Sequence, residues 1–169
     1  MSFDELIRNR YSVRSYVPKE VPQNIVDEII EAARVAPSAG NAQPTVVYVL
    51  GKDKFPLLRE YVRYDFGAQN MLLVGYDKNL SLKRNIDNYD FGIEDTAIAI
   101  THMMLKITDL GLGSCWVGYI NKQMKDVFNI EDNIELVALL PFGYITPGDV
   151  PNGKHNQRRS MEEFKRIIN

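Results

Sequence analysis

The longest helical pattern in the chain, residues 93–110, restricts the fold more than any other part of the sequence. Its apolar side chains cover most of the circumference of a helix, and they are Ala97, Ile98, Ile100, Met103, Met104, Leu105 and Ile107. A helix that is apolar on nearly all sides is buried in the folded protein. One chain could bury such a helix centrally, but a subunit interface would bury it more readily, since obligate interfaces resemble a core cut in half. The pattern therefore predicts a long buried central helix and favours a homodimer.

Four shorter apolar runs have the β-branched and aromatic composition of strands. We predict strands at residues 45–50, 71–75, 114–118 and 134–140. The first of these runs lies between Pro44 and Gly51 and is expected to be buried. Residues 77–90 are polar and predict an exposed excursion before the long helix.

Capping-box patterns mark the beginnings of two short helices. Ser2 with Glu5, and again Ser160 with Glu163, have the spacing of this motif, and the first helix is expected to end near Asn9. Further helices are predicted at residues 22–36, 53–62 and 121–128. Because helices and strands do not alternate strictly and no repeat or linker divides the sequence, we predict one α+β domain over residues 1–169.

Charge and composition argue against several classes of partner. A chain of 169 residues with 45% hydrophobic residues can bury a core without metal or crosslinks. Lys and Arg number 20 against 22 Asp and Glu, so no basic field would attract nucleic acid or anionic lipid. The first residues lack the pattern of a signal peptide, and no apolar run approaches the length of a membrane span. We therefore expect a cytoplasmic protein with no nucleic-acid or membrane partner.

Cysteine and histidine are scarce in the sequence. Cys115 is the only cysteine, so no disulfide can form within one chain, which fits a reducing compartment. His102, His155 and Cys115 do not have the spacing of metal ligands, and we predict no metal site. His102 lies within the long helical pattern and Cys115 has no histidine near it in sequence. Both are therefore expected to be packed rather than catalytic.

Residues 10–14, Arg-Tyr-Ser-Val-Arg, offer two guanidiniums and one hydroxyl at every second position. In an extended segment Arg10, Ser12 and Arg14 would project to the same side. Arginine makes charge-assisted, often bidentate bonds to phosphate, and the serine hydroxyl adds a neutral donor. The spacing indicates a phosphate site, although Arg-x-Ser-x-Arg by itself is more often a solvated surface turn.

Residues 36–44, Ala-Pro-Ser-Ala-Gly-Asn-Ala-Gln-Pro, combine small residues, two prolines and two side-chain amides. Such a segment suits a rigid loop lying close to a planar heterocycle, because an amide both donates and accepts hydrogen bonds along one edge. The alternative is a plain loop between two elements.

Two later segments, residues 111–118 (Gly-Leu-Gly-Ser-Cys-Trp-Val-Gly) and 158–163 (Arg-Arg-Ser-Met-Glu-Glu), follow these motifs. With the four segments in this order, the chain resembles the nitroreductase family of FMN-dependent oxidoreductases from about Phe3 to Phe164. The resemblance implies a nitroreductase-like fold, with a central, mostly antiparallel sheet flanked by helices around a long buried central helix. It also implies FMN as cofactor, NADH or NADPH as reductant, and a homodimer with the active site at the subunit interface.

The resemblance implies a role toward the flavin for each matching residue. Arg10, Ser12 and Arg14 would hold the phosphate and ribityl chain, and the same phosphate would be closed from the tail by Arg158 and Arg159. Pro37, Ser38 and Ala39 match a segment that the other subunit presents to the flavin ring. The resemblance implies that the Asn41 amide contacts the isoalloxazine edge. It also implies that Trp116 and Gly118 lie in the segment whose backbone amide approaches N5. Val117 stands where some members have glutamate, so that side-chain role is absent here.

The activity implied by the resemblance is hydride transfer from NAD(P)H through flavin N5 to a small oxidised acceptor, with ping-pong kinetics. No side chain is expected to be catalytic, because the flavin performs the redox chemistry. Nitroaromatic, quinone and free flavin acceptors stay open. Residues 77–91 would influence substrate choice, with Tyr89 and Phe91 as candidates that face the ring. The alternative is a flavin-binding or sensing module without nicotinamide-driven turnover.

Overall fold

The computed structural model of the chain describes residues 1–168. Within these residues four strands form one sheet in the order β1-β2-β4-β3, and each neighbouring pair is antiparallel. The strands are β1 (Thr45–Val49), β2 (Asn70–Asp77), β3 (Gly113–Ser114) and β4 (Ile134–Gly143). The predicted α+β class with an antiparallel central sheet is confirmed.

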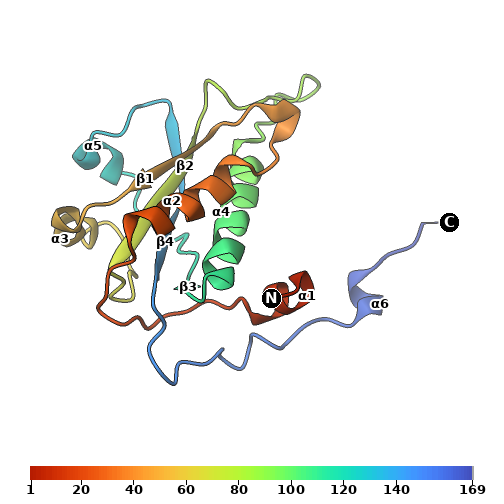
Figure 1. Cartoon of the computed structure of the whole chain (residues 1–169). Helices are drawn as coiled ribbons and strands as arrows, with labels where there is room; N and C mark the ends of the chain where they lie inside the picture. The colour runs from red at the N-terminus through yellow and green to blue at the C-terminus, as the bar shows by residue number, and fades with distance from the viewer. Residues whose placement is uncertain (169) are drawn as a thin grey trace.

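Helices cover both faces of this sheet (Figure 1). The helices are α1 (Phe3–Asn9), α2 (Gln23–Arg34), α3 (Phe55–Leu58), α4 (Gly92–Asp109), α5 (Met124–Phe128) and α6 (Met161–Phe164), with 3-10 turns η1 (Ala39–Asn41) and η2 (Lys52–Lys54) on either side of β1. α2 and α4 pack together on one face, and α3 and α5 lie on the other. α1 contacts α4, whereas α6 lies beyond the body on an extended tail.

β2 is buried on both sides because helices cover both faces of the sheet. Leu72 and Val74 lie in a core with α2 and α4, while Met71 and Leu73 lie in a second core with α3 and α5. This follows from the alternation of side chains along a strand. The burial of each such side chain contributes about 1.5–3 kcal/mol. An unbroken apolar run, rather than an alternating one, is therefore what this central strand requires.

Local signals in the sequence place the ends of several helices correctly. Ser2 and Glu5 form the predicted capping box of α1, and Ser160 and Glu163 form that of α6. Gly111 follows α4 with φ 72°, a left-handed conformation that favours glycine at a helix end. The predicted positions of these helix ends are confirmed.

Three predicted elements differ from the structure. The helix predicted over residues 53–62 is shorter than expected, because η2 is followed by a short α3 that ends at Leu58, and Asp53 does not cap it. The strand predicted over residues 114–118 is reduced to Gly113–Ser114, and Val117 pairs with Leu139 only as an isolated bridge. β1 is half-buried rather than buried, because it is an edge strand.

α4 is buried along one face and not on nearly all sides, which corrects the prediction from its composition. Ile100 and Met103 face the sheet and are fully buried, whereas Ile93 is 56% exposed and Ile98 is 38% exposed. The sheet and α2 cover only one side of the helix, so a second apolar face is open in a single chain. No helix within residues 1–168, α4 included, is long and apolar enough to span a membrane.

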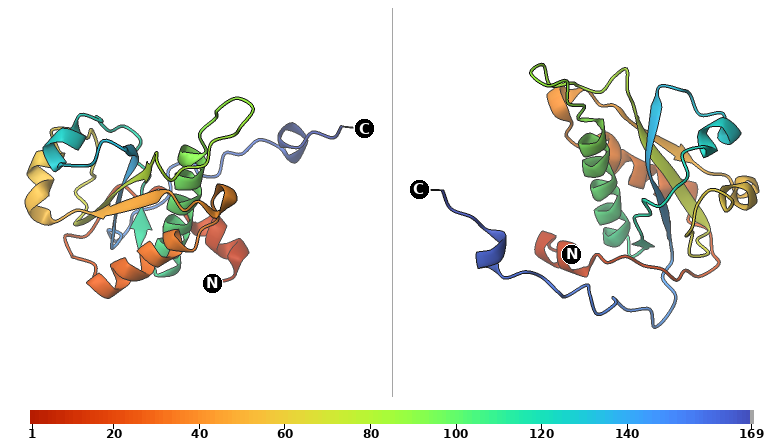
Figure 2. Two further views of the ribbon diagram at one scale, coloured as in Figure 1. Left: turned by 90° about the horizontal axis from the view of Figure 1, so that it is seen from above. Right: turned by 180° about the vertical axis from the view of Figure 1, so that it is seen from behind.

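The carboxyl-terminal tail, dark blue, extends away from the body of the molecule (Figure 2). Figure 2 shows it running past α1 and then outward, ending in α6 and an extended segment. Its apolar side chains are open, since Phe164 and Ile167 are both 71% exposed. The tail therefore has apolar surface that its own chain does not bury.

Candidate functional site

The predicted alternation along residues 10–14 is present in the structure. The backbone at Arg10 is extended, and Val13 is buried with its N–H donating to the Ser114 carbonyl at 3.0 Å. Ser12 forms an isolated parallel bridge with Ser114, which places this segment beside β3. Because Val13 faces the core, Arg10, Ser12 and Arg14 project to the opposite side.

A glycine in β3 permits this close approach. A Cβ at position 113 would lie 2.5 Å from Cγ2 of Val13 and 2.9 Å from Cγ1 of Ile145. Contacts this short do not occur between real side chains, so only glycine lets the segment seat on β3. Gly113 therefore positions the residues around Ser12.

The two ends of the chain form a basic pocket of about 300 Å³. Its lining residues come from residues 10–14 and from the start of the tail: Arg10, Tyr11, Ser12, Arg14, Asn152, Lys154, His155 and Arg158. Arg10, Arg14 and Arg158 form no ion pair with a carboxylate in the part of the chain that the structure describes. Burial and the charge of Arg158 lower the pKa of Arg10 from its ordinary value, which agrees with cations brought close together.

The pocket fits a phosphate group. Several uncompensated cations in one concave site repel one another, and an anion relieves that repulsion. Ser12 adds a hydroxyl, and the Oγ of its bridge partner Ser114 is buried without a partner among the described residues. Guanidinium and hydroxyl donors around one opening match the oxygens of a phosphate monoester such as the one in FMN.

Four lining residues were missed from the sequence: Tyr11, Asn152, Lys154 and His155. The Tyr11 hydroxyl donates to Oδ2 of Asp149 at 3.0 Å, and burial together with this bond raises the pKa of Tyr11 to about 12. Nε2 of His155 lies 3.0 Å from the carbonyl oxygen of Arg8. These contacts hold the start of the tail against the end of α1. The Asn152-Gly153 turn pattern was the one local signal for this return of the chain.

Residues 37–41 lie apart from the basic pocket within one chain. Pro37 and Ser38 line a separate cavity of about 130 Å³ together with Asp95. The Ala39 N–H donates to Oδ1 of Asp95 at 2.8 Å, while Oδ2 of Asp95 is buried without a partner among residues 1–168. Asn41 is exposed with φ 56°, and its carbonyl accepts a bond from Gln43. The bond to Asp95 ties the loop to α4, but within one chain it does not meet the arginines of the basic pocket.

The predicted residues of the 115–118 segment occupy different environments. Trp116 is half-buried against the core of α2 and α4, and Gly118 is exposed, with Nε1 of Trp116 3.5 Å from the place where a Cβ at position 118 would lie. Cys115 is a packed thiol whose pKa burial raises, so it is not set up as a nucleophile.

Arg159 is the predicted phosphate-binding residue that lies outside the basic pocket. Its guanidinium lies 5.6 Å from the centre of the Phe164 ring. Its predicted contact with the phosphate stays a prediction.

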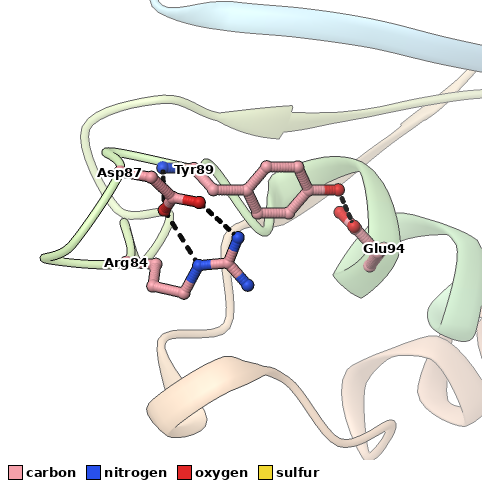
Figure 3. Close-up of polar contacts among 4 residues, drawn as sticks. All are labelled: Arg84, Asp87, Tyr89 and Glu94. Atoms are coloured by element: carbon pink, nitrogen blue, oxygen red, sulfur yellow. Dashed lines mark hydrogen bonds and ion pairs between the residues drawn. The ribbon is translucent and has the colours of Figure 1, made fainter.

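The excursion predicted over residues 77–90 is largely exposed, although Asp77 belongs to β2 and Ser81 is buried, and it is closed by its own side chains (Figure 3). Arg84 pairs with Asp87, and the Tyr89 hydroxyl donates to Glu94 at the start of α4. Tyr89 and Phe91 meet edge to face, with ring centres 5.4 Å apart. These rings are held in place, whereas their expected orientation toward a flavin stays a prediction.

No cluster of three metal-ligating His, Cys, Asp or Glu side chains occurs within residues 1–168. His102 is half-buried on α4 and His155 lies at the basic pocket. The charged groups of the site are therefore cations suited to an anion.

Most of the chain matches the model of one protein family. The model described as the nitroreductase family matches residues 7–68 and 61–144. These matches include residues 10–14, residues 36–44 and the 111–118 segment, but not the tail.

Known proteins are similar over nearly the full chain. A protein of Archaeoglobus fulgidus, provisionally named an NADH dehydrogenase/NAD(P)H nitroreductase, is 27% identical over 150 residues, which cover 83% of both chains. A solved nitroreductase family protein of Clostridium difficile 630 is 31% identical with a TM-score of 0.91, covering 100% of this chain and 99% of that one. A provisionally named nitroreductase of Exiguobacterium sibiricum, solved in complex with FMN, shares the fold at 17% identity with a TM-score of 0.87, covering 99% of this chain and 98% of that one.

Proposed function

The chain belongs to the nitroreductase family of oxidoreductases, and we propose that it is an FMN-dependent enzyme. In this proposal NADH or NADPH is the reductant, a small oxidised molecule is the acceptor, and one site serves both in turn, which gives ping-pong kinetics. The observation that supports it most is the basic pocket, where both ends of the chain bring unpaired cations together. FMN bound to a structural relative of the same fold supports the choice of ligand.

Residues of the pocket would bind and orient the cofactor. Arg10, Arg14 and Arg158 would neutralise the phosphate dianion, and Ser12 would donate a hydrogen bond to it. With the phosphate held there, the ring would extend toward Trp116 and Gly118, whose open backbone leaves room for a planar group. The chemistry supplied by bound FMN is acceptance of a hydride from NAD(P)H and its delivery to the acceptor.

A homodimer with the site at its interface is the second part of the proposal. Residues 37–41 lie apart from the basic pocket in one chain, so they would contact a flavin held mainly by the other subunit. The open face of α4 around Ile93 and Ile98, and the open apolar tail, offer the surface that a second chain would cover. Obligate dimers bury apolar faces of this kind.

The acceptor is proposed only as a class: a nitroaromatic, a quinone or a free flavin. Tyr89 and Phe91, in the excursion that packs near Gly40 through Leu82, would border its entrance. The excursion is fixed by the Arg84–Asp87 and Tyr89–Glu94 contacts, so it would act as a preformed wall (Figure 3).

The test is a visible absorbance spectrum of the purified protein, followed by anaerobic addition of NADH and of NADPH. Flavin bands that bleach with a nicotinamide and return with quinone or nitroaromatic are expected. Bands that persist with both donors would favour a flavin-binding module without turnover. A protein that holds no flavin even after addition of FMN would defeat the proposal.

A further inference from the structure

A cluster of one arginine and two tyrosines lies next to the exposed backbone of Gly118. The Cζ of Arg63 is 5.2 Å from the ring centre of Tyr64 and 5.6 Å from that of Tyr119. The two segments are joined by backbone bonds, since Val62 bridges Ile120 and the Asn121 N–H donates to the Tyr61 carbonyl at 2.8 Å. We call Arg63, Tyr64 and Tyr119 the Arg63 cluster. Its position is thus fixed by the fold and not only by side-chain rotamers.

The Arg63 cluster continues to the basic pocket as a row of rings and guanidiniums. The rings of Tyr64 and Phe66 are stacked, with centres 5.6 Å apart and planes inclined by 2°. Arg14, which lines the basic pocket, lies 5.9 Å from the centre of the Phe66 ring. The cluster therefore lies on the same stretch of surface as the proposed flavin site.

The cluster is open and its charge is uncompensated. Tyr64 is 43% exposed and Tyr119 is 68% exposed. Arg63 makes no ion pair within residues 1–168, whereas Arg59 in the same segment pairs with Asp65 through Nε and Oδ2 at 2.7 Å. A neighbouring carboxylate thus satisfies one arginine of this segment and leaves the other free for a ligand.

The residue types suit a nucleotide. An exposed aromatic ring stacks on a purine base, and such stacking persists whichever base is presented. A guanidinium lying over aromatic rings binds phosphate and still keeps its cation–π contact. FMN has one phosphate, which the basic pocket would hold. The nicotinamide dinucleotide that must approach the flavin carries further phosphates and an adenine base, and these match the arginine and the exposed ring of the cluster.

We propose that the Arg63 cluster binds the adenosine phosphate half of the nicotinamide donor. Arg63 pairs with phosphate, and Tyr119, which at 68% is the more exposed of the two tyrosines, stacks on the adenine. The reduced nicotinamide at the other end of the donor then reaches the flavin. This inference rests on the proposed function, because it assigns the donor of that same site.

Direct binding tests the proposal without turnover. Adenosine 5′-monophosphate and adenosine 2′,5′-bisphosphate are titrated by calorimetry into FMN-loaded protein. We expect Arg63→Gln to weaken binding about tenfold or more, as expected from the loss of one charged hydrogen bond, and Tyr119→Leu to weaken it as well. The matched control, Arg59→Gln, should bind as wild type does. Tighter binding of the 2′,5′-bisphosphate would identify the 2′-phosphate of NADPH as the partner of Arg63, whereas equal binding would identify the phosphate common to both donors.

Kinetics provide the second test. Arg63→Gln should raise KM for NADH or NADPH with kcat kept, and it should leave reduction by reduced nicotinamide mononucleotide, which lacks adenosine, unchanged. Unaltered binding and KM in Arg63→Gln would overturn the inference, as would loss of FMN from this variant, which would assign the cluster to the flavin instead. A wild-type protein that holds no FMN defeats the proposed function, whereas a flavoprotein that nicotinamides reduce without any dependence on Arg63 defeats this inference alone.

Discussion

A single glycine decides whether the phosphate-facing residues can take their positions. In Gly113→Ala the new methyl would meet Val13 at 2.5 Å, and neither β3 nor residues 10–14 can shift without moving Ser12. Overpacking of this kind costs about 1–3 kcal/mol. We expect the free energy of unfolding, measured by urea titration, to fall by that amount, with a lower urea midpoint. Gly153→Ala is the matched control, because nothing lies within 4 Å of its added carbon, and it should leave the midpoint within error.

Arg14 provides the residue-scale test of the pocket. Arg14→Ala should weaken FMN binding, because a hydrogen bond to a charged group contributes about 1.5–3 kcal/mol, or about ten- to a hundredfold in Kd. Quenching of flavin fluorescence on binding measures this change. Arg59→Ala removes an arginine that pairs with Asp65 and does not line the basic pocket, and this variant should bind FMN as wild type does. Unchanged affinity in Arg14→Ala would remove Arg14 from the site.

The arginines could be found from sequence, whereas several of their neighbours could not. Arg10, Ser12 and Arg14 follow a period of two, which depends only on the geometry of an extended chain. Lys154 and His155 join them only because the tail returns past α1, a contact between residues far apart in sequence. The Asn152-Gly153 pattern indicates a turn but not where the chain goes after it, so those residues required the structure.

At the scale of elements, sequence patterns predicted correctly those features that depend on hydrogen bonds between residues close in sequence. Capping boxes at Ser2 and Ser160 depend on bonds across one turn, and both were predicted correctly. The helix expected after Asp53 is shorter than predicted: it begins as the 3-10 turn η2, its regular part ends at Leu58, and the chain continues to Val62 only as hydrogen-bonded turns. The burial of α4 was overestimated, because composition shows that a face is apolar and does not show which molecule covers it.

The open face of α4 gives the element-scale prediction. Ile93→Lys places a charge on that face without disturbing the core, since the side chain is 56% exposed in one chain. If a second chain covers this face, burial of an unpaired charge would shift the protein toward monomers and weaken FMN binding with it. Light scattering after size-exclusion chromatography measures the mass. Val127→Lys on α5, on the far side of the sheet, should keep the wild-type mass, and a dimer that persists in Ile93→Lys would argue against this interface.

For the molecule as a whole, ligand binding and stability should change together. If FMN is held by the basic pocket of one chain and by residues 37–41 of another, it binds the folded, assembled protein and not the unfolded chains. FMN at about a hundred times its Kd then adds about 2.7 kcal/mol of stability, and for a chain of this size the melting temperature rises by about 2–4 °C for each kcal/mol. A thermal shift with FMN at saturation measures this rise.

Riboflavin, which has the same ring and ribityl chain without the phosphate, is the matched ligand control. Because the cations of the basic pocket have no carboxylate partners within residues 1–168, most of the stabilisation should depend on the phosphate, and riboflavin should raise the melting temperature much less than FMN. Equal shifts for the two ligands would mean that the ring is recognised and the basic pocket is not used. An unchanged transition with both would contradict flavin binding itself, whichever residues were assigned to it.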